Sequence, residues 1–179
     1  SPRVKFHGLK LQVDKTGGGN YENFLVKGIG YAPFPIGTFP SEWGLCKYTG
    51  DLGSKPQFNC AQRNIYDDPA VLERDLPLIK AMHANTIRTW GKASSLLLQK
   101  ARQYDLKVIA GFWVNHDLDF TSPDVRANLI EEFKDYVDTF KDDPALLMWG
   151  LSNENNTHFC SQAKFSCNRE SQAKAFYQL

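Results

Sequence analysis

The chain has 179 residues, and its 21 lysines and arginines almost balance its 20 aspartates and glutamates, so the formal net charge is +1. This balance argues against electrostatic capture of nucleic acid or of an anionic membrane. The sequence contains no run of about 18 apolar residues, the length needed to span a bilayer. Aromatic residues make up 13% of the chain, which leaves rings available for a sugar or another ring-stacking ligand.

The N-terminal part of the sequence predicts a β-hairpin. Segments 4–13 and 21–28 flank the turn Lys15–Asn20, whose three glycines supply the positive φ angles that a tight reversal needs. We assign residues 1–26 to this hairpin, which caps a domain formed by residues 27–179. The first residues show no basic stretch followed by an apolar run, the pattern of a secretory signal.

Segments rich in β-branched and aromatic residues then alternate with segments of helical period, which is typical of βα units around a parallel sheet. The last expected strand is apolar on both faces, as a buried parallel strand is. The four expected strands cover residues 27–31, 85–90, 107–113 and 146–151.

Three helices are expected between these strands. The first begins at Asp68-Pro69, an N-cap followed by proline, and Pro77 should kink or delay it. The second covers residues 96–104, and the third begins at Ser122-Pro123. The apolar positions of the first helix are Leu72, Leu76 and Ile79, and those of the third are Leu129, Ile130, Phe133, Val137 and Phe140.

Segment 33–64 has no periodicity and is expected to be a long loop, a kind of segment that often carries function. It contains Cys46 and Cys60, while Cys160 and Cys167 lie in a polar segment near the end. Two local disulfides fit this spacing better than a zinc site, which needs short Cys-x-x-Cys or His-x-x-x-His motifs. The disulfides and the Asn155-Asn156-Thr157 sequon favour secretion.

Four βα units fit either a small open sheet or half of a (β/α)₈ barrel, which typically has about 250 residues. A dinucleotide-binding fold is disfavoured, because Gly28-x-Gly30 is not followed by the third glycine of the fingerprint or by a helix. No phosphate-binding Gly-x-x-x-x-Gly-Lys-Ser/Thr motif is present either.

Polar and aromatic residues follow the expected strands at their carboxyl ends, where functional groups gather in parallel α/β folds. The opposite ends of the strands carry only residues typical of solvated surface. The four carboxyl-end segments are 31–34, 88–90, 113–117 and 152–156.

The segment Asp142–Glu154 is a buried strand that ends in Asn-Glu, and it closely resembles the fourth-strand motif of the clan A glycoside hydrolases. Segments 24–31, 74–80 and 85–90 resemble the first strand, first helix and second strand of that clan. The resemblance covers residues 24–155 and leans towards family 2 and the fungal β-1,3-glucanosyltransferases of family 72. It implies an α/β fold of the (β/α)₈ TIM-barrel type, represented by about four βα units.

The resemblance also implies roles for individual residues. Glu154 matches the general acid/base, and Asn153 matches the residue that binds the sugar 2-hydroxyl. The nucleophilic glutamate of this clan follows the seventh strand, so it is expected beyond Leu179. The further candidate substrate-binding residues are Arg88, which we expect to pair with a carboxylate, and Trp113, His116, Trp90 and Tyr31.

Asp117 and Asp119 are weaker candidates for a second carboxylate. A metal site formed by His116 with Asp117, Asp119 and His158 is disfavoured, because these residues lack ligand spacing. We therefore expect a secreted or cell-wall retaining enzyme without a cofactor that acts on β-linked glucan or a related polysaccharide. Two alternatives stay open: a catalytically silent carbohydrate-binding half-barrel, and a small α/β domain with an unrelated structural role.

Overall fold

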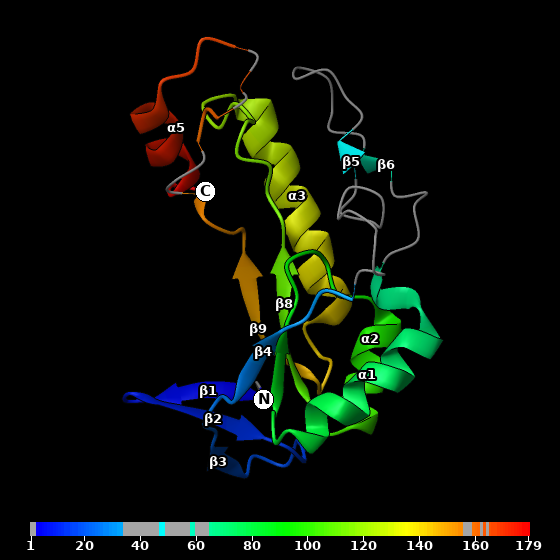
Figure 1. Cartoon of the computed structure of the whole chain (residues 1–179). Coiled ribbons are helices and arrows are strands. Elements are labelled where there is room, and N and C mark those ends of the chain that lie inside the picture. Colours follow the sequence, from blue (N-terminus) through cyan, green and yellow to red (C-terminus); the bar gives the residue numbers. More distant parts are fainter. Residues whose placement is uncertain are drawn as a thin grey trace.

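The computed structural model of the chain describes residues 3–33, 47–48, 58–59, 65–155, 159–161, 163 and 165–179. In these ranges the protein is a mixed α/β structure with a four-stranded parallel sheet, a three-stranded antiparallel sheet and a two-stranded ladder (Figure 1). No helix in the described ranges is long and apolar enough to cross a membrane.

The parallel sheet has the strand order β4-β7-β8-β9, and every neighbouring pair is parallel. Its strands are β4 (Gly28–Gly30), β7 (Thr86–Arg88), β8 (Lys107–Phe112) and β9 (Leu146–Leu151). The four strands predicted from the sequence are confirmed, and the bounds of the last one agree at both ends. A parallel sheet in sequential strand order is compatible with part of a (β/α)₈ barrel.

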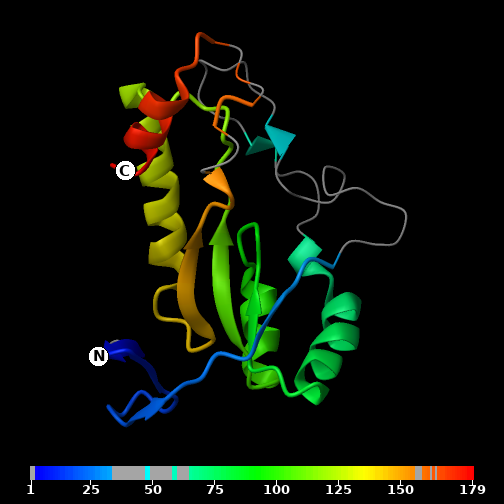
Figure 2. The same cartoon turned by 60° about the vertical axis from the view of Figure 1, so that its left-hand side comes forward.

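The antiparallel sheet consists of β1 (Val4–His7), β2 (Lys10–Asp14) and β3 (Tyr21–Asn23). The prediction of one continuous strand over residues 4–13 is wrong, because the chain reverses at Gly8, whose φ is 59°. The turn predicted at Lys15–Asn20 is confirmed, with positive φ at two of its glycines. Both views place this sheet near the amino ends of the parallel strands (Figures 1 and 2).

Helix α1 (Pro69–Ala81) begins where its sequence predicts, because the Asp68 side chain accepts hydrogen bonds from the backbone amides of Ala70 and Val71. Pro77 lies inside this helix and does not delay its start. Helix α2 (Ser95–Gln103) begins after Ser94, whose hydroxyl accepts a hydrogen bond from the amide of Leu97. The predicted apolar positions of α1 are all buried.

Helix α3 (Pro123–Phe140) begins at the predicted proline, but its buried face differs from the predicted one. Ile130 is 49% exposed, whereas Tyr136 is buried. The Tyr136 hydroxyl accepts a hydrogen bond of 2.6 Å from the backbone amide of Ala93. The polar end of this residue is therefore satisfied inside the core, which a stripe chosen on hydrophobicity alone does not anticipate.

The two faces of the parallel sheet are unequally covered. Phe112 of β8 and Trp149 of β9 point towards α3, where both form ring contacts with Phe133 and Tyr136. The opposite face carries a row of cross-strand neighbours, and its side chains are only half-buried at Arg88, Ile109 and Met148. This row consists of Gly30, Arg88, Ile109 and Met148.

The burial of strand β9 also differs from the prediction. It is an edge strand of the described sheet. The prediction that it is buried on both faces is wrong. Its first two residues are buried, but burial falls along the strand until Leu151 is 60% exposed. Because side chains of a strand point to the two faces of its sheet, this pattern shows that the described part of the chain does not fully cover these faces near the carboxyl end of β9.

Two short strands and a further helix also belong to the described structure. Strands β5 (Lys47–Tyr48) and β6 (Phe58–Asn59) pair antiparallel within the segment that the sequence predicts as a loop. Helix α5 (Arg169–Phe176) lies beyond the carboxyl ends of β8 and β9, and its phenylalanine ring contacts Phe120 and Phe159 (Figures 1 and 2).

Candidate functional site at the carboxyl ends of the strands

Arg88 and Asn153 meet at the carboxyl end of the parallel sheet. Arg88 ends β7, and its Nη2 atom donates a hydrogen bond of 3.1 Å to Oδ1 of Asn153, two residues after β9. Because a guanidinium only donates, the Asn153 oxygen must face Arg88 and its NH₂ group points elsewhere. Asn153 can therefore offer hydrogen-bond donors to a ligand.

The predicted carboxylate partner of Arg88 is absent from the described residues, where this guanidinium forms no salt bridge. An amide oxygen takes the place of the carboxylate. A neutral partner satisfies one donor of the guanidinium and leaves its positive charge uncompensated, so the site can still attract an anionic group.

Trp90 joins this pair. The Arg88 Cζ atom lies 5.1 Å from the centroid of the Trp90 ring, within the range of a cation–π contact. Both side chains are half-buried. The structure therefore brings together Arg88, Trp90 and Asn153, three of the residues that the sequence indicates.

Two glycines allow the segment 89–90 to lie close to the sheet. A Cβ atom at Gly111 would lie 2.3 Å from the carbonyl oxygen of Thr89, and one at Gly30 would lie 2.3 Å from Cη2 of Trp90. Thr89 also accepts a hydrogen bond of 2.9 Å from the Gly111 amide on its hydroxyl. Sequence reasoning missed this role of Gly30, although a glycine inside a strand often marks a close approach.

Glu154 lies in a strained turn directly after β9. Ser152 and Glu154 have φ angles of 55° and 52°, a region that costs a residue with a side chain roughly 1–2 kcal/mol. The Ser152 amide donates a hydrogen bond of 2.8 Å to the carbonyl of Phe112, which holds the turn against the end of β8. Glu154 is exposed. Strain of this kind gathers at functional sites.

Trp113 and His116 form a second aromatic group in the loop after β8. Their ring centroids lie 5.2 Å apart, and the rings are nearly perpendicular at 82°. Both residues are half-buried. They lie past the carboxyl end of β8, as the sequence predicts.

Tyr31 does not join these groups. It is buried, and its hydroxyl donates a hydrogen bond of 3.0 Å to Oδ2 of Asp75 on α1. Burial raises the pKa of the Tyr31 phenol, and the negative charge of Asp75 raises it further. The phenol thus fastens α1 to the end of β4.

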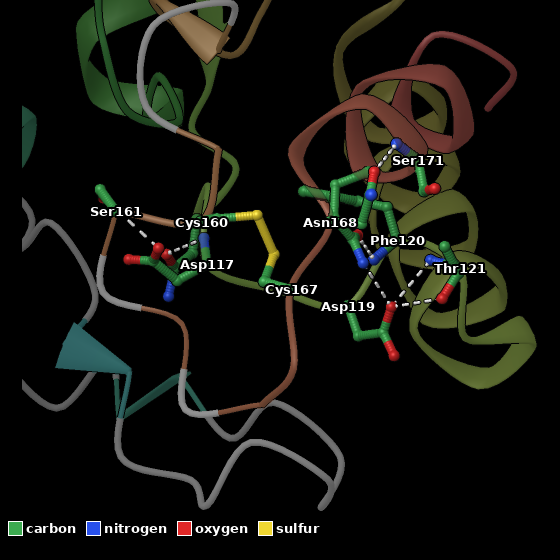
Figure 3. Close-up of a disulfide and its surroundings, with 11 residues drawn as sticks. Asp117, Asp119, Phe120, Thr121, Cys160, Ser161, Cys167, Asn168 and Ser171 are labelled. Carbon is green, nitrogen blue, oxygen red and sulfur yellow. Dashed lines mark hydrogen bonds between the residues drawn. A yellow bond between two sulfur atoms is a disulfide. The ribbon is translucent and has the colours of Figure 1, made fainter.

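The loop after β8 is tied to the C-terminal segment by two aspartates (Figure 3). Asp119 accepts hydrogen bonds from Thr121 and from Nε2 of Gln172 on α5, the latter of 2.8 Å. Burial alone would raise the pKa of Asp119, but the hydrogen bonds from Thr121 and Gln172 outweigh it and lower the pKa. Asp117 accepts a hydrogen bond of 3.3 Å from the hydroxyl of Ser161.

The predicted disulfide between Cys160 and Cys167 is confirmed, with Cα atoms 5.7 Å apart (Figure 3). Cys46 and Cys60 lie outside the described residues, and so does His158. No group of three or more His, Cys, Asp or Glu side chains in the described ranges is arranged to hold a metal ion.

The sequon asparagine is buried. Asn155 is 6% exposed, and its Nδ2 atom has no hydrogen-bond partner among the residues that the structure describes. N-glycosylation uses this same nitrogen, so the position is unsuited to a surface glycan.

Comparison with known proteins shows a weak similarity to one curated enzyme. No protein-family profile matches the sequence. The chain is 26% identical over 172 residues to the 1,3-β-glucanosyltransferase GAS2 of Saccharomyces cerevisiae. The alignment covers 88% of the chain but 27% of GAS2, so the chain spans about a quarter of the length of this relative. This similarity supports a glycoside hydrolase-like relationship, in line with the resemblance carried by Asn153 and Glu154.

Proposed function

We propose that the chain is the acid/base-bearing half of a retaining glycoside hydrolase or transglycosylase that acts on β-linked glucan. The weak similarity to a 1,3-β-glucanosyltransferase favours a β-1,3-linked substrate. The observation that carries the proposal is the hydrogen bond between Arg88 and Asn153, because it orients the amide that directly precedes Glu154.

Glu154 is the proposed general acid/base. In a retaining mechanism it protonates the leaving oxygen while a second carboxylate, about 5–5.5 Å away, attacks the anomeric carbon. Glu154 then deprotonates the water or sugar hydroxyl that releases the glycosyl group. The nucleophile is expected from the C-terminal half of a complete barrel, as the resemblance implies.

The substrate contacts follow from the arrangement of the other side chains. The NH₂ group of Asn153 faces away from Arg88 and can donate to a sugar hydroxyl. Trp90 and Trp113 offer half-buried rings for stacking on a pyranose face, and His116 packs edge-on against the Trp113 ring beside this surface. These roles complete the proposed subsite.

The proposed architecture is the first four βα units of a (β/α)₈ barrel over residues 27–179, with residues 1–26 capping it. The row of Gly30, Arg88, Ile109 and Met148 lies on the face that would line the barrel interior. The half-buried state of that face is what a sheet separated from the rest of a barrel would have. The disulfide supports a secreted or cell-wall location.

Isothermal titration calorimetry with linear β-1,3-gluco-oligosaccharides tests whether this half-site recognises glucan. We expect the chain to bind them and Asn153→Ala to bind about two- to tenfold more weakly, since one hydrogen bond to the sugar contributes roughly 0.5–1.5 kcal/mol. A chain without affinity, or an unchanged Asn153→Ala variant, would contradict the proposal. Glucan binding without any turnover, also in a protein that holds the second half of the barrel, would identify the catalytically silent carbohydrate-binding alternative.

A further inference from the structure

We infer that Gly30 and Trp90 are positioning residues, which hold Arg88 and through it the carboxamide of Asn153. The inference rests on the proposed function for its consequence in glucan binding. The contacts themselves link three strands, from β4 through β7 to the turn after β9.

The first contact is steric. The outer edge of the Trp90 ring fills the space that a side chain at position 30 would occupy, since a Cβ atom there would lie 2.3 Å from Cη2 and 2.9 Å from Cζ3. Gly30 does not need its conformational freedom, because its φ lies outside the left-handed region. A side chain at this position would therefore force the indole to move.

The second contact joins Trp90 to Arg88. The guanidinium carbon lies 5.1 Å from the ring centroid, and the ring face attracts its positive charge. No carboxylate in the described part of the chain forms a salt bridge with Arg88. The indole therefore takes on a larger share of fixing the direction of this long side chain than it would beside an ion pair.

The third contact makes the orientation of the Asn153 carboxamide depend on the position of Arg88. Arg88 holds the Asn153 oxygen at 3.1 Å, so a shift of the guanidinium turns the carboxamide and redirects the NH₂ group that would meet a sugar hydroxyl. A residue on β4 thus controls a hydrogen-bond donor beyond β9, across two intervening strands.

Gly30→Ala is the test variant, and the chain offers a matched control. Gly28 lies two residues earlier on β4 and faces the same way, but a Cβ atom there meets only ordinary contacts, at 3.4 Å from Val26 and 3.7 Å from Thr86. Trp90→Phe provides the rescue, because phenylalanine keeps a ring face for Arg88 and lacks the outer atoms that block position 30.

Nuclear magnetic resonance of the Asn153 side-chain amide gives a readout that is independent of any ligand. Gly30→Ala should shift this signal and Gly28→Ala should not. The double variant Gly30→Ala/Trp90→Phe should give the signal of Trp90→Phe alone. An Asn153 signal that is unchanged in Gly30→Ala overturns the inference. If Gly30→Ala does not fold, Trp90→Leu decides, because loss of the ring must shift the same signal.

Titration with a linear β-1,3-gluco-oligosaccharide separates this inference from the proposed function. We expect Gly30→Ala to weaken binding by about threefold or more, in the range of couplings between contacting residues, while Gly28→Ala binds normally. If the unmodified chain binds no glucan but Gly30→Ala still shifts the Asn153 signal, the proposed function fails and the positioning role stands. If glucan binds and Gly30→Ala changes neither signal nor affinity, the positioning role fails alone.

Discussion

The hydrogen bond between Arg88 and Asn153 joins the end of β7 to the turn after β9, and these two strands are not neighbours. Its contribution to stability can be measured directly. A double-mutant cycle of Arg88→Met and Asn153→Ala should give a coupling free energy of about 1 kcal/mol, because the bond is charge-assisted but half-exposed. Chemical denaturation of the four proteins provides the measurement. Additive effects of the two substitutions would mean that the contact contributes nothing.

We predict that Asp14 contributes to the stability of the fold and that this contribution is lost in acid. Its buried carboxylate accepts backbone hydrogen bonds of 2.8 Å from both Gly17 and Gly19, and the bond from Gly19 is the main cause of its lowered pKa. Because the native pKa lies below the unfolded value of about 3.9, Asp14 stabilises the fold above that pH. The contribution is lost as the pH falls through the lower native pKa.

Urea unfolding at pH 7 and at pH 3 tests this expectation. The unmodified chain should lose more stability between the two pH values than Asp14→Asn does. Glu22→Gln, which changes an exposed carboxylate of β3, is the control and should behave like the unmodified chain. An Asp14→Asn variant with the same acid loss as the unmodified chain would refute the role of this carboxylate.

At the residue scale, the sequence pointed to Arg88, Trp90 and Asn153 but not to their partners. The strand ends follow from the βα alternation, so the residues that gather there are predictable. The partner of Arg88 depends on how far a long side chain reaches across β8, which no local pattern contains. Tyr31 shows the same limit, since only the packing of α1 turns its hydroxyl towards Asp75.

At the element scale, we predict that the four cysteines form two local disulfides. Non-reducing peptide mapping should join Cys160 to Cys167, as the structure has them, and Cys46 to Cys60, which stays a prediction from the sequence. A Cys160→Ser/Cys167→Ser variant should lose at most about 2.5 kcal/mol, since the closed loop is short. Cross-pairing such as Cys46 with Cys160 would show that the local assignment is wrong.

Elements with strong local signals were predictable, and those set by tertiary contacts were not. Proline at the first position fixed the starts of α1 and α3, and the apolar run fixed β9. The buried face of α3 was predicted wrongly at Ile130, which is exposed. Tyr136 is buried instead, and its hydroxyl accepts a hydrogen bond from the Ala93 amide. The first hairpin was missed because a single Gly8 makes the reversal.

At the scale of the whole molecule, the exposed edge of the parallel sheet predicts self-association. Strand β9 presents an unpaired edge in the described sheet together with exposed Leu151, and such edges pair with other chains. Light scattering on the separated chain should show association that grows with concentration. Leu151→Lys should reduce it, whereas Ile130→Lys, which alters an exposed apolar residue of α3, should not. A chain that stays monomeric at high concentration would contradict the open-edge interpretation.

The central claim, that Glu154 is the general acid/base of a retaining glycosidase, is tested most directly by the kinetics of Glu154→Gln in a protein that combines this chain with the second half of the barrel. Turnover of natural glucan should fall far more than turnover of aryl glycosides with good leaving groups, because only the poor leaving group must be protonated as it departs. Added azide should restore turnover of the aryl glycosides, since it attacks the glycosyl-enzyme without a base. Equal losses for both substrates, with no effect of azide, would contradict the assignment of Glu154.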